Sequence, residues 1–101
     1  DSRAAMTHLV DDEIRSDILI SLRRAEGQLR GIQRMIETNE PCLAIAGQMS
    51  AVRKALDSAY VRMAVCFMKQ ELSSRLAPDA EAAAELSDVL DDVQAILGKI
   101  R

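Results

Sequence analysis

The stretch CLAIAGQMSAVRKALDSAYVRMAVC, residues 42–66, decides the fold of this chain. Its apolar residues recur alternately three and four positions apart, which is the spacing of a helix with one apolar seam. Pro41 suits the first turn of such a helix, and Asn39 or Glu40 is expected to cap it. We therefore predict one long helix that ends near Arg75. Its seam consists of Cys42, Ile45, Met49, Val52, Leu56, Ala59, Met63 and Cys66.

The segment before this stretch repeats the pattern and predicts a second long helix, from about Asp12 to Thr38. Gly27 and Gly31 lie one turn apart inside it, and each costs helix stability, so another backbone is expected to approach this face closely. The sequence TNEP separates the two helices by a short loop, which predicts an antiparallel hairpin. The seam of this helix consists of Ile18, Leu22, Ala25, Leu29, Ile32 and Ile36.

A shorter third helix is predicted after the break APD, with Asp79 as its cap. Its apolar positions are Leu86, Val89, Val93, Ile96 and Ile100. The predicted fold is all-α, with three helices per chain. Two hairpins would bury their seams against each other as a dimeric four-helix bundle. We interpret residues 1–11 as an expression scar, DSRAA, followed by a flexible N-terminal segment, and residues 12–101 as a single domain.

The charges are unevenly distributed along the 101 residues. Net charge is −3, but residues 15–75 carry ten bases and six acids, a net of +4. Residues 1–14 and 76–101 are acidic, with net charges of −3 and −4. Because a local basic patch matters more for phosphate binding than the total charge, the middle of the chain is a candidate nucleic-acid interface.

Arginines gather on one side of the predicted first helix, and two more bases lie in the middle of the second. Without helix-turn-helix or zinc-finger spacing, this pattern favours contacts to the duplex backbone. A solvated face with ion pairs to Glu26 and Glu37 is the alternative on composition alone. A helical protein-interaction module that does not bind DNA is the rival function, and the acidic ends favour it. One His and no nucleophile–base arrangement argue against an enzyme.

The two cysteines, Cys42 and Cys66, lie about 36 Å apart along one helix, so they cannot meet within a chain. Antiparallel second helices in a dimer would bring Cys42 of one chain toward the Cys66 region of the other. Cys42 lies in a first helical turn, which favours a thiolate, and is the candidate sensing or ligating residue. Cys66 is expected in the core, and His8 on the surface. Unpaired thiols and the lack of a long apolar run predict a cytoplasmic protein with no membrane segment.

The motif LRRAEGQLRGIQRMIE, followed by Cys42 and then QMSAVRKALD, resembles the CsoR/RcnR/FrmR family of bacterial transcriptional repressors. The resemblance covers about Ile18 to Leu72. It implies an all-helical homodimer that assembles into a homotetramer and binds double-stranded operator DNA until an effector is sensed between subunits. It also implies the residues that contact DNA, and Ser21 stands where the family often has Arg. The expected DNA contacts are Arg23, Arg24, Gln28, Arg30, Arg34, Arg53 and Lys54.

The resemblance places Phe67 and Glu71 opposite Cys42 of the partner chain, where copper sensors have His and Cys. Phe67 cannot bind a metal, and a carboxylate is a poor ligand for Cu(I). This departure favours a thiol-reactive effector at Cys42, with Glu71 and Cys66 as partners. The alternative is a repressor that responds to copper, nickel, cobalt or zinc and binds it through Cys42 with His8 or Glu71. A transition-metal ion is therefore the only cofactor that the sequence suggests.

Overall fold

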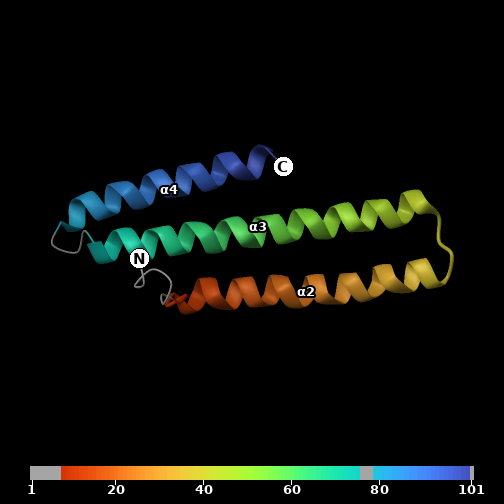
Figure 1. Cartoon of the computed structure of the whole chain (residues 1–101). Helices are drawn as coiled ribbons and strands as arrows, with labels where there is room; N and C mark the ends of the chain where they lie inside the picture. The colour runs from red at the N-terminus through yellow and green to blue at the C-terminus, as the bar shows by residue number, and fades with distance from the viewer. Residues whose placement is uncertain (1–7, 76–78, 101) are drawn as a thin grey trace.

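The computed structural model describes residues 8–75 and 79–100, and within these ranges it contains three helices and no strand. Helix α2 spans Asp12–Glu37, α3 spans Cys42–Arg75 and α4 spans Ala80–Ile100. The first two run antiparallel, and α4 lies along α3 on the side away from α2 (Figure 1). The predicted all-α class and hairpin are confirmed, while residues 1–5, interpreted as a scar, lie outside the described ranges. In the described part of the chain, no helix has the length and apolarity needed to cross a membrane.

Local hydrogen bonds define where the hairpin helices begin and end. Asp11 caps α2, because its carboxylate accepts a hydrogen bond from the Ile14 N–H at 3.1 Å. Asn39 adopts a left-handed conformation with φ of 59°, and the N–H groups of Asn39 and Glu40 bond back to the last turn of α2. This is a Schellman end, which tolerates Asn. The predicted cap of α3 is therefore wrong: Asn39 and Glu40 close α2, and Pro41 occupies the position before α3.

In each predicted seam, some residues are buried in the core of the hairpin, and the seam residues between them are exposed. The buried residues of α2 are spaced seven apart, and those of α3 lie opposite them. Ala25, Ile32 and Val52 form one buried cluster, against which Ile45 packs. Small side chains such as Ala25 and Ala59 let the two backbones lie close together. The full buried set is Ile18, Ala25, Ile32, Val52, Ala59, Val65 and Cys66.

The other half of each seam is exposed in the single chain. These side chains are as apolar as the buried ones and alternate with them along the same helices. An isolated hairpin therefore leaves an apolar face that spans both α2 and α3. We call this face the open seam; it consists of Leu22, Leu29, Ile36, Met49, Leu56 and Met63.

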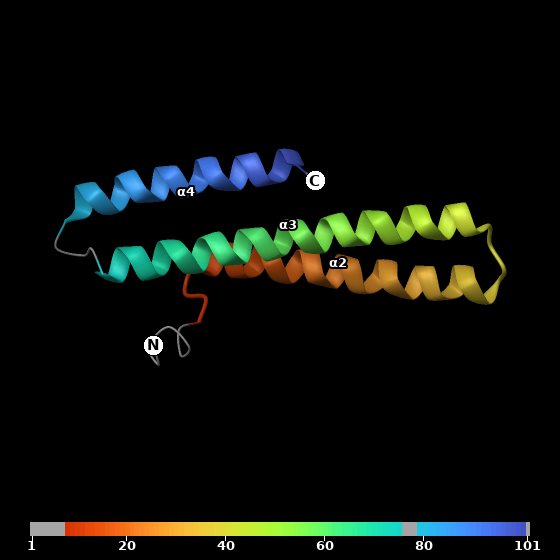
Figure 2. The same cartoon turned by 45° about the horizontal axis from the view of Figure 1, so that its top comes forward.

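Helix α4 packs along α3 and leaves most of its predicted apolar positions exposed. The caps agree: Asp79 accepts a hydrogen bond from the Ala82 N–H at 3.0 Å, as expected. The apolar positions Leu86, Val89, Val93 and Ile96 are exposed, whereas Leu90 and Leu97 are half-buried. An ion pair between Lys69 and Asp91 joins the two helices on the side of α4 that carries Leu90. A second view shows α4 beside α3 again (Figure 2).

Candidate effector site and nucleic-acid interface

Cys42 is the first residue of α3, and its side chain is exposed. The first turn of a helix leaves N–H groups without intrahelical partners, and Cys42 lies in that turn. Backbone hydrogen bonds from Asn39 and Glu40 to the last turn of α2 fix the loop before Cys42. Helix α3 therefore begins at the end of the hairpin. Cys42 is thus a reachable soft nucleophile or ligand at the tip of the molecule.

Cys66 has the opposite environment. It is buried, and its thiol donates a hydrogen bond to Oε1 of Gln70 at 3.5 Å. Burial raises the pKa of the Cys66 thiol, and the carboxylate of Asp11 raises it further, while Lys69 acts in the opposite direction. Because α3 is continuous from Cys42 to Arg75, the two thiols stay far apart within one chain. Cys66 therefore behaves as a core residue here.

The segment before α2 is attached to α3 by one side chain. Gln70 donates a hydrogen bond from Nε2 to the His8 carbonyl at 2.9 Å, and its Oε1 accepts one from the Val10 N–H at 3.1 Å. Residues 8–10, part of the segment predicted to be flexible, are thereby held against α3. Gln70 is not among the predicted site residues, because a Gln on a helix surface gives no distinguishing signal in the sequence. The contact places His8 at the same end of the hairpin as Glu71 and Cys66.

The candidate metal ligands do not meet within one chain. Glu71 is half-buried, and its carboxylate forms an ion pair with Arg75 at 3.5 Å. Phe67, one turn earlier, is also half-buried. Cys42 is at the opposite end of α3 from Glu71 and His8. Among the described residues, no three His, Cys, Asp or Glu side chains come together as a metal-binding group. Any site that contains both Cys42 and Glu71 needs a second chain.

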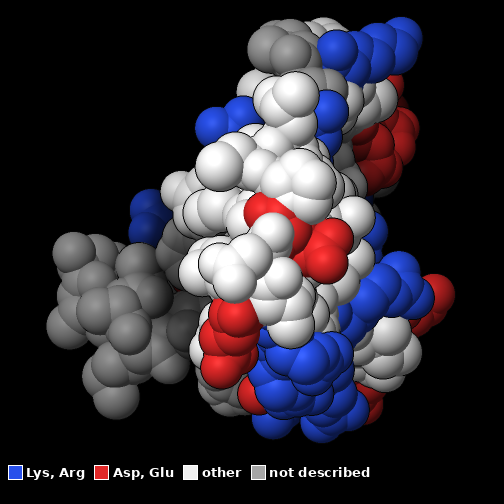
Figure 3. Space-filling view, turned by 90° about the vertical axis from the view of Figure 1, so that its right-hand side faces the viewer, with Lys and Arg blue, Asp and Glu red and all other residues white. Residues whose placement is uncertain are grey.

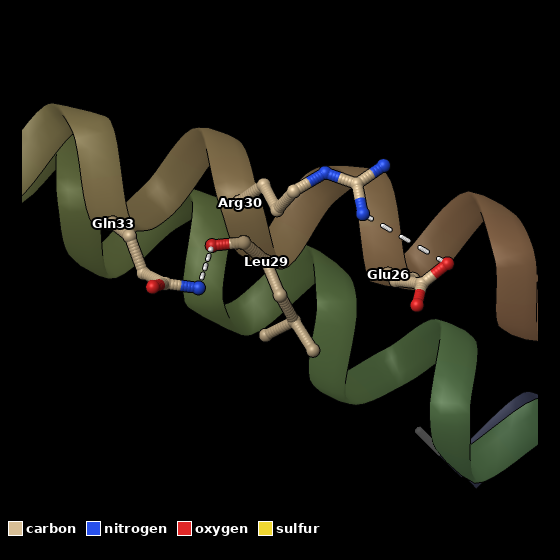
Figure 4. Close-up of polar contacts among 4 residues, drawn as sticks. All are labelled: Glu26, Leu29, Arg30 and Gln33. Carbon is tan, nitrogen blue, oxygen red and sulfur yellow. Dashed lines mark hydrogen bonds and ion pairs between the residues drawn. The ribbon is translucent and has the colours of Figure 1, made fainter.

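The predicted DNA contacts are all exposed on the hairpin. Lys and Arg side chains gather in the lower part of the end view (Figure 3), where α2 lies in Figure 1. Among these residues Arg30 alone pairs with a described acid, Glu26, at 3.9 Å, and both side chains project outward from α2 (Figure 4). An exposed pair of this kind contributes about 0.3–0.5 kcal/mol, which phosphate contacts can replace. The others, available for phosphate, are Arg23, Arg24, Arg34, Arg53 and Lys54.

The glycines of α2 were expected to mark a close approach by another backbone. In the described chain, a methyl group added at Gly27 or Gly31 would meet no other atom within 4 Å. Packing inside the chain therefore does not require either glycine. Gly31 does line a groove with Gln28 and Arg34, two of the predicted DNA contacts. The groove leaves the α2 backbone accessible at this point.

Comparison with known proteins gives the chain a family context. A family model described as a metal-sensitive transcriptional repressor matches residues 14–99. The copper-sensing transcriptional repressor RicR of Mycobacterium tuberculosis is 50% identical over 42 residues, which are 42% of this chain and 44% of RicR. The copper-sensing transcriptional repressor CsoR of Bacillus subtilis is 43% identical over 42 residues, 42% of each chain. The matched segment thus spans less than half of each curated relative. No solved structure matches the chain significantly.

Proposed function

The chain belongs to the metal-sensitive transcriptional repressors, and we propose that it represses by binding operator DNA as a homotetramer and responds to an effector at Cys42. Members of this family are DNA-binding repressors and not enzymes, in agreement with the sequence analysis. The family match over residues 14–99 carries the proposal. It also favours a repressor over a protein-interaction module that does not bind DNA. Residues 12–101 would form the single DNA-binding domain.

The open seam supports the proposed dimer. In each hairpin helix, buried and exposed apolar positions alternate with a seven-residue repeat, so a single chain satisfies only half of the pattern. Monomeric proteins rarely leave such a continuous apolar face in water. Two hairpins that pair through this face would form the four-helix bundle. The exposed stripe of α4 offers a second apolar surface, through which two dimers can associate.

The basic residues on the outer side of the hairpin support DNA binding. Pairing through the open seam would leave Arg23, Arg30 and Arg34 on the outside and duplicate them by the two-fold symmetry. A tetramer would repeat the basic surface again, along a longer stretch of duplex. Contacts of this type position a protein on the phosphate backbone, and a few base contacts supply sequence preference.

The effector that we propose first is a metal ion, because the family is metal-sensitive and the two relatives are named as copper-sensing. The family match shifts the balance away from the thiol-reactive effector that the missing ligands favoured. In a dimer, Cys42 of one chain would hold the ion with Glu71 and His8 of the other. A thiolate, an imidazole and a carboxylate suit zinc, nickel or cobalt better than Cu(I), which prefers soft donors. A bound metal would supply a charge and a fixed link between two subunits.

A thiol-reactive effector is the second candidate, and the exposure of Cys42 favours it. The thiol is reachable at the tip of the hairpin, whereas Phe67 adds no donor near it in the dimer that the resemblance implies. An electrophile, an oxidant or a persulfide would modify Cys42 directly. Cys66 of the partner chain would be the second thiol in this version, although burial makes it slow to react.

Either effector would act by shifting a population between two packings of the bundle. A change at Cys42 alters DNA affinity only to the extent that it favours one arrangement of the hairpins over the other. Because the basic residues and Cys42 are on the same two helices, a rotation of one hairpin against its partner would change the spacing of the basic surfaces. The operator would then lose some of its phosphate contacts.

Operator binding tests the proposal. The reduced, metal-free protein is titrated into labelled duplex from upstream of its own gene, and fluorescence anisotropy is read at several salt concentrations. We expect saturable, site-preferring binding whose affinity falls steeply as salt rises. Arg30→Gln should reduce the magnitude of the slope of log affinity against log salt by about one unit for each copy of Arg30 in the homotetramer that contacts a phosphate. Lys99→Gln, on α4, is the matched control. Equal affinity for random duplex would refute the proposal that the protein is an operator-binding repressor.

A further inference from the structure

A cavity of about 650 Å³ lies between the start of α2, the second half of α3 and α4, apart from Cys42 and from the predicted DNA contacts. Its floor is formed by Val65 and Cys66, both buried, and Val10 and Ile14 line it on the α2 side. Gln70 holds the Val10 segment in place over this region. The volume lies within the range of about 300–1,000 Å³ that is typical of small-molecule sites. The exposed area of the lining is mostly apolar, although most of the lining residues are polar or charged.

Two cations, Lys69 and Arg62, and one carboxylate, Asp11, line the cavity. Lys69 is paired with Asp91 of α4, and the carboxylate of Asp11 is engaged with the Ile14 N–H as the α2 cap. Arg62, which also lines the cavity, is half-buried and has no ion pair with any described residue. A guanidinium beside an apolar surface is well suited to hold a carboxylate through two parallel hydrogen bonds.

We propose that this cavity binds an amphipathic monoanion, a medium-chain carboxylate, with its apolar chain on Val65 and Ile14 and its carboxylate on Arg62. The hydrocarbon chain would displace water from the apolar lining, and the carboxylate would neutralise Arg62. The cavity shares Cys66 with the proposed thiol-reactive effector site, but the ligand would be held by Arg62 and by apolar side chains that have no role in that site. A ligand there would also touch the segment that Gln70 holds and α4 through Gln94. It would stabilise the contacts of α3 with both.

Titration calorimetry of the full chain with decanoate, in the absence of DNA, tests the proposal. We expect saturable binding of one decanoate per chain, and much weaker binding of decanol, which lacks the charge, and of acetate, which lacks the chain. Arg62→Gln should weaken decanoate binding at least tenfold. Arg53→Gln, which removes a cation outside the cavity, should leave it unchanged. Ser73→Trp, at an exposed position of the lining, should block the cavity and abolish binding.

The proposal would be overturned by a lack of saturable decanoate binding to the wild-type protein or by unchanged affinity in Arg62→Gln. Equal binding of decanol would also contradict it, because it would indicate apolar adsorption to the open seam. Circular dichroism checks that each variant keeps its helices. If Ser73→Trp does not fold, Arg62→Gln and the decanol comparison still decide. Because no DNA is present, failure here would leave the operator-binding proposal standing.

Discussion

Replacing Leu29 by Ala tests the dimer that the open seam predicts. Leu29 is 45% exposed in the single chain and lies between the buried residues Ala25 and Ile32 in sequence. The change removes three carbon atoms, worth about 2.4 kcal/mol at full burial and about 1.1 kcal/mol for the fraction that pairing would cover. Two-fold symmetry doubles this to about 2.2 kcal/mol per dimer, which corresponds to about 40-fold weaker association.

Sedimentation equilibrium over a range of protein concentrations measures this association. Ile20→Ala is the matched control. Ile20 is 50% exposed on the same helix, but it projects from the side of the helix opposite Leu29, about 180° away. We expect Leu29→Ala to weaken dimerisation strongly and Ile20→Ala to leave it nearly unchanged. A wild-type protein that stays monomeric at micromolar concentration, or equal effects of the two variants, would refute the reasoning from the seam.

Three further predictions concern the chain itself. Ile32→Ala, at a position only 6% exposed, should lower the free energy of unfolding by about 2–4 kcal/mol in urea titrations, and a loss below half of that would mean that this core is looser than described. Gly31→Ala should raise it by up to about 1 kcal/mol, because the added methyl meets no atom; destabilisation instead would place another backbone at this position. Cys66 holds its proton more tightly in the folded state because burial raises its pKa, so stability should be unaffected below the ordinary thiol pKa and fall as pH rises above it. Cys66→Ala should remove that alkaline loss, and a pH profile identical to wild type would contradict the assignment.

The spacing of apolar residues predicts the helices well, because it reports which side of each helix leaves water. Both long helices end within a residue or two of the prediction, and Asp79 is the expected cap. Spacing does not tell which half of a seam a chain buries by itself and which half it leaves open. Ile32 and Leu29 are equivalent in the pattern, and only the structure separates them.

The errors arise where a polar contact outweighs the apolar pattern. The apolar spacing does not indicate which face of α4 meets α3, and the Lys69–Asp91 ion pair joins the two helices. Asn39 was expected to cap α3 but is used by the end of α2. Gln70 contacts a backbone 60 and 62 residues away in sequence, and residue spacing within a helix contains no information on such a contact. The proposed effector site combines residues of two chains, so its geometry stays a prediction.

Release of the operator by effectors in wild type and in Cys42→Ala is the most direct test of the central claim. The protein–operator complex is titrated with Zn(II), Ni(II), Cu(I), formaldehyde and a persulfide donor, and anisotropy reports the bound fraction. We expect that at least one metal releases wild-type protein and that Cys42→Ala, which binds the same DNA, stays bound at the same concentration. Equal release of both proteins would contradict the assignment of Cys42 as the sensing residue.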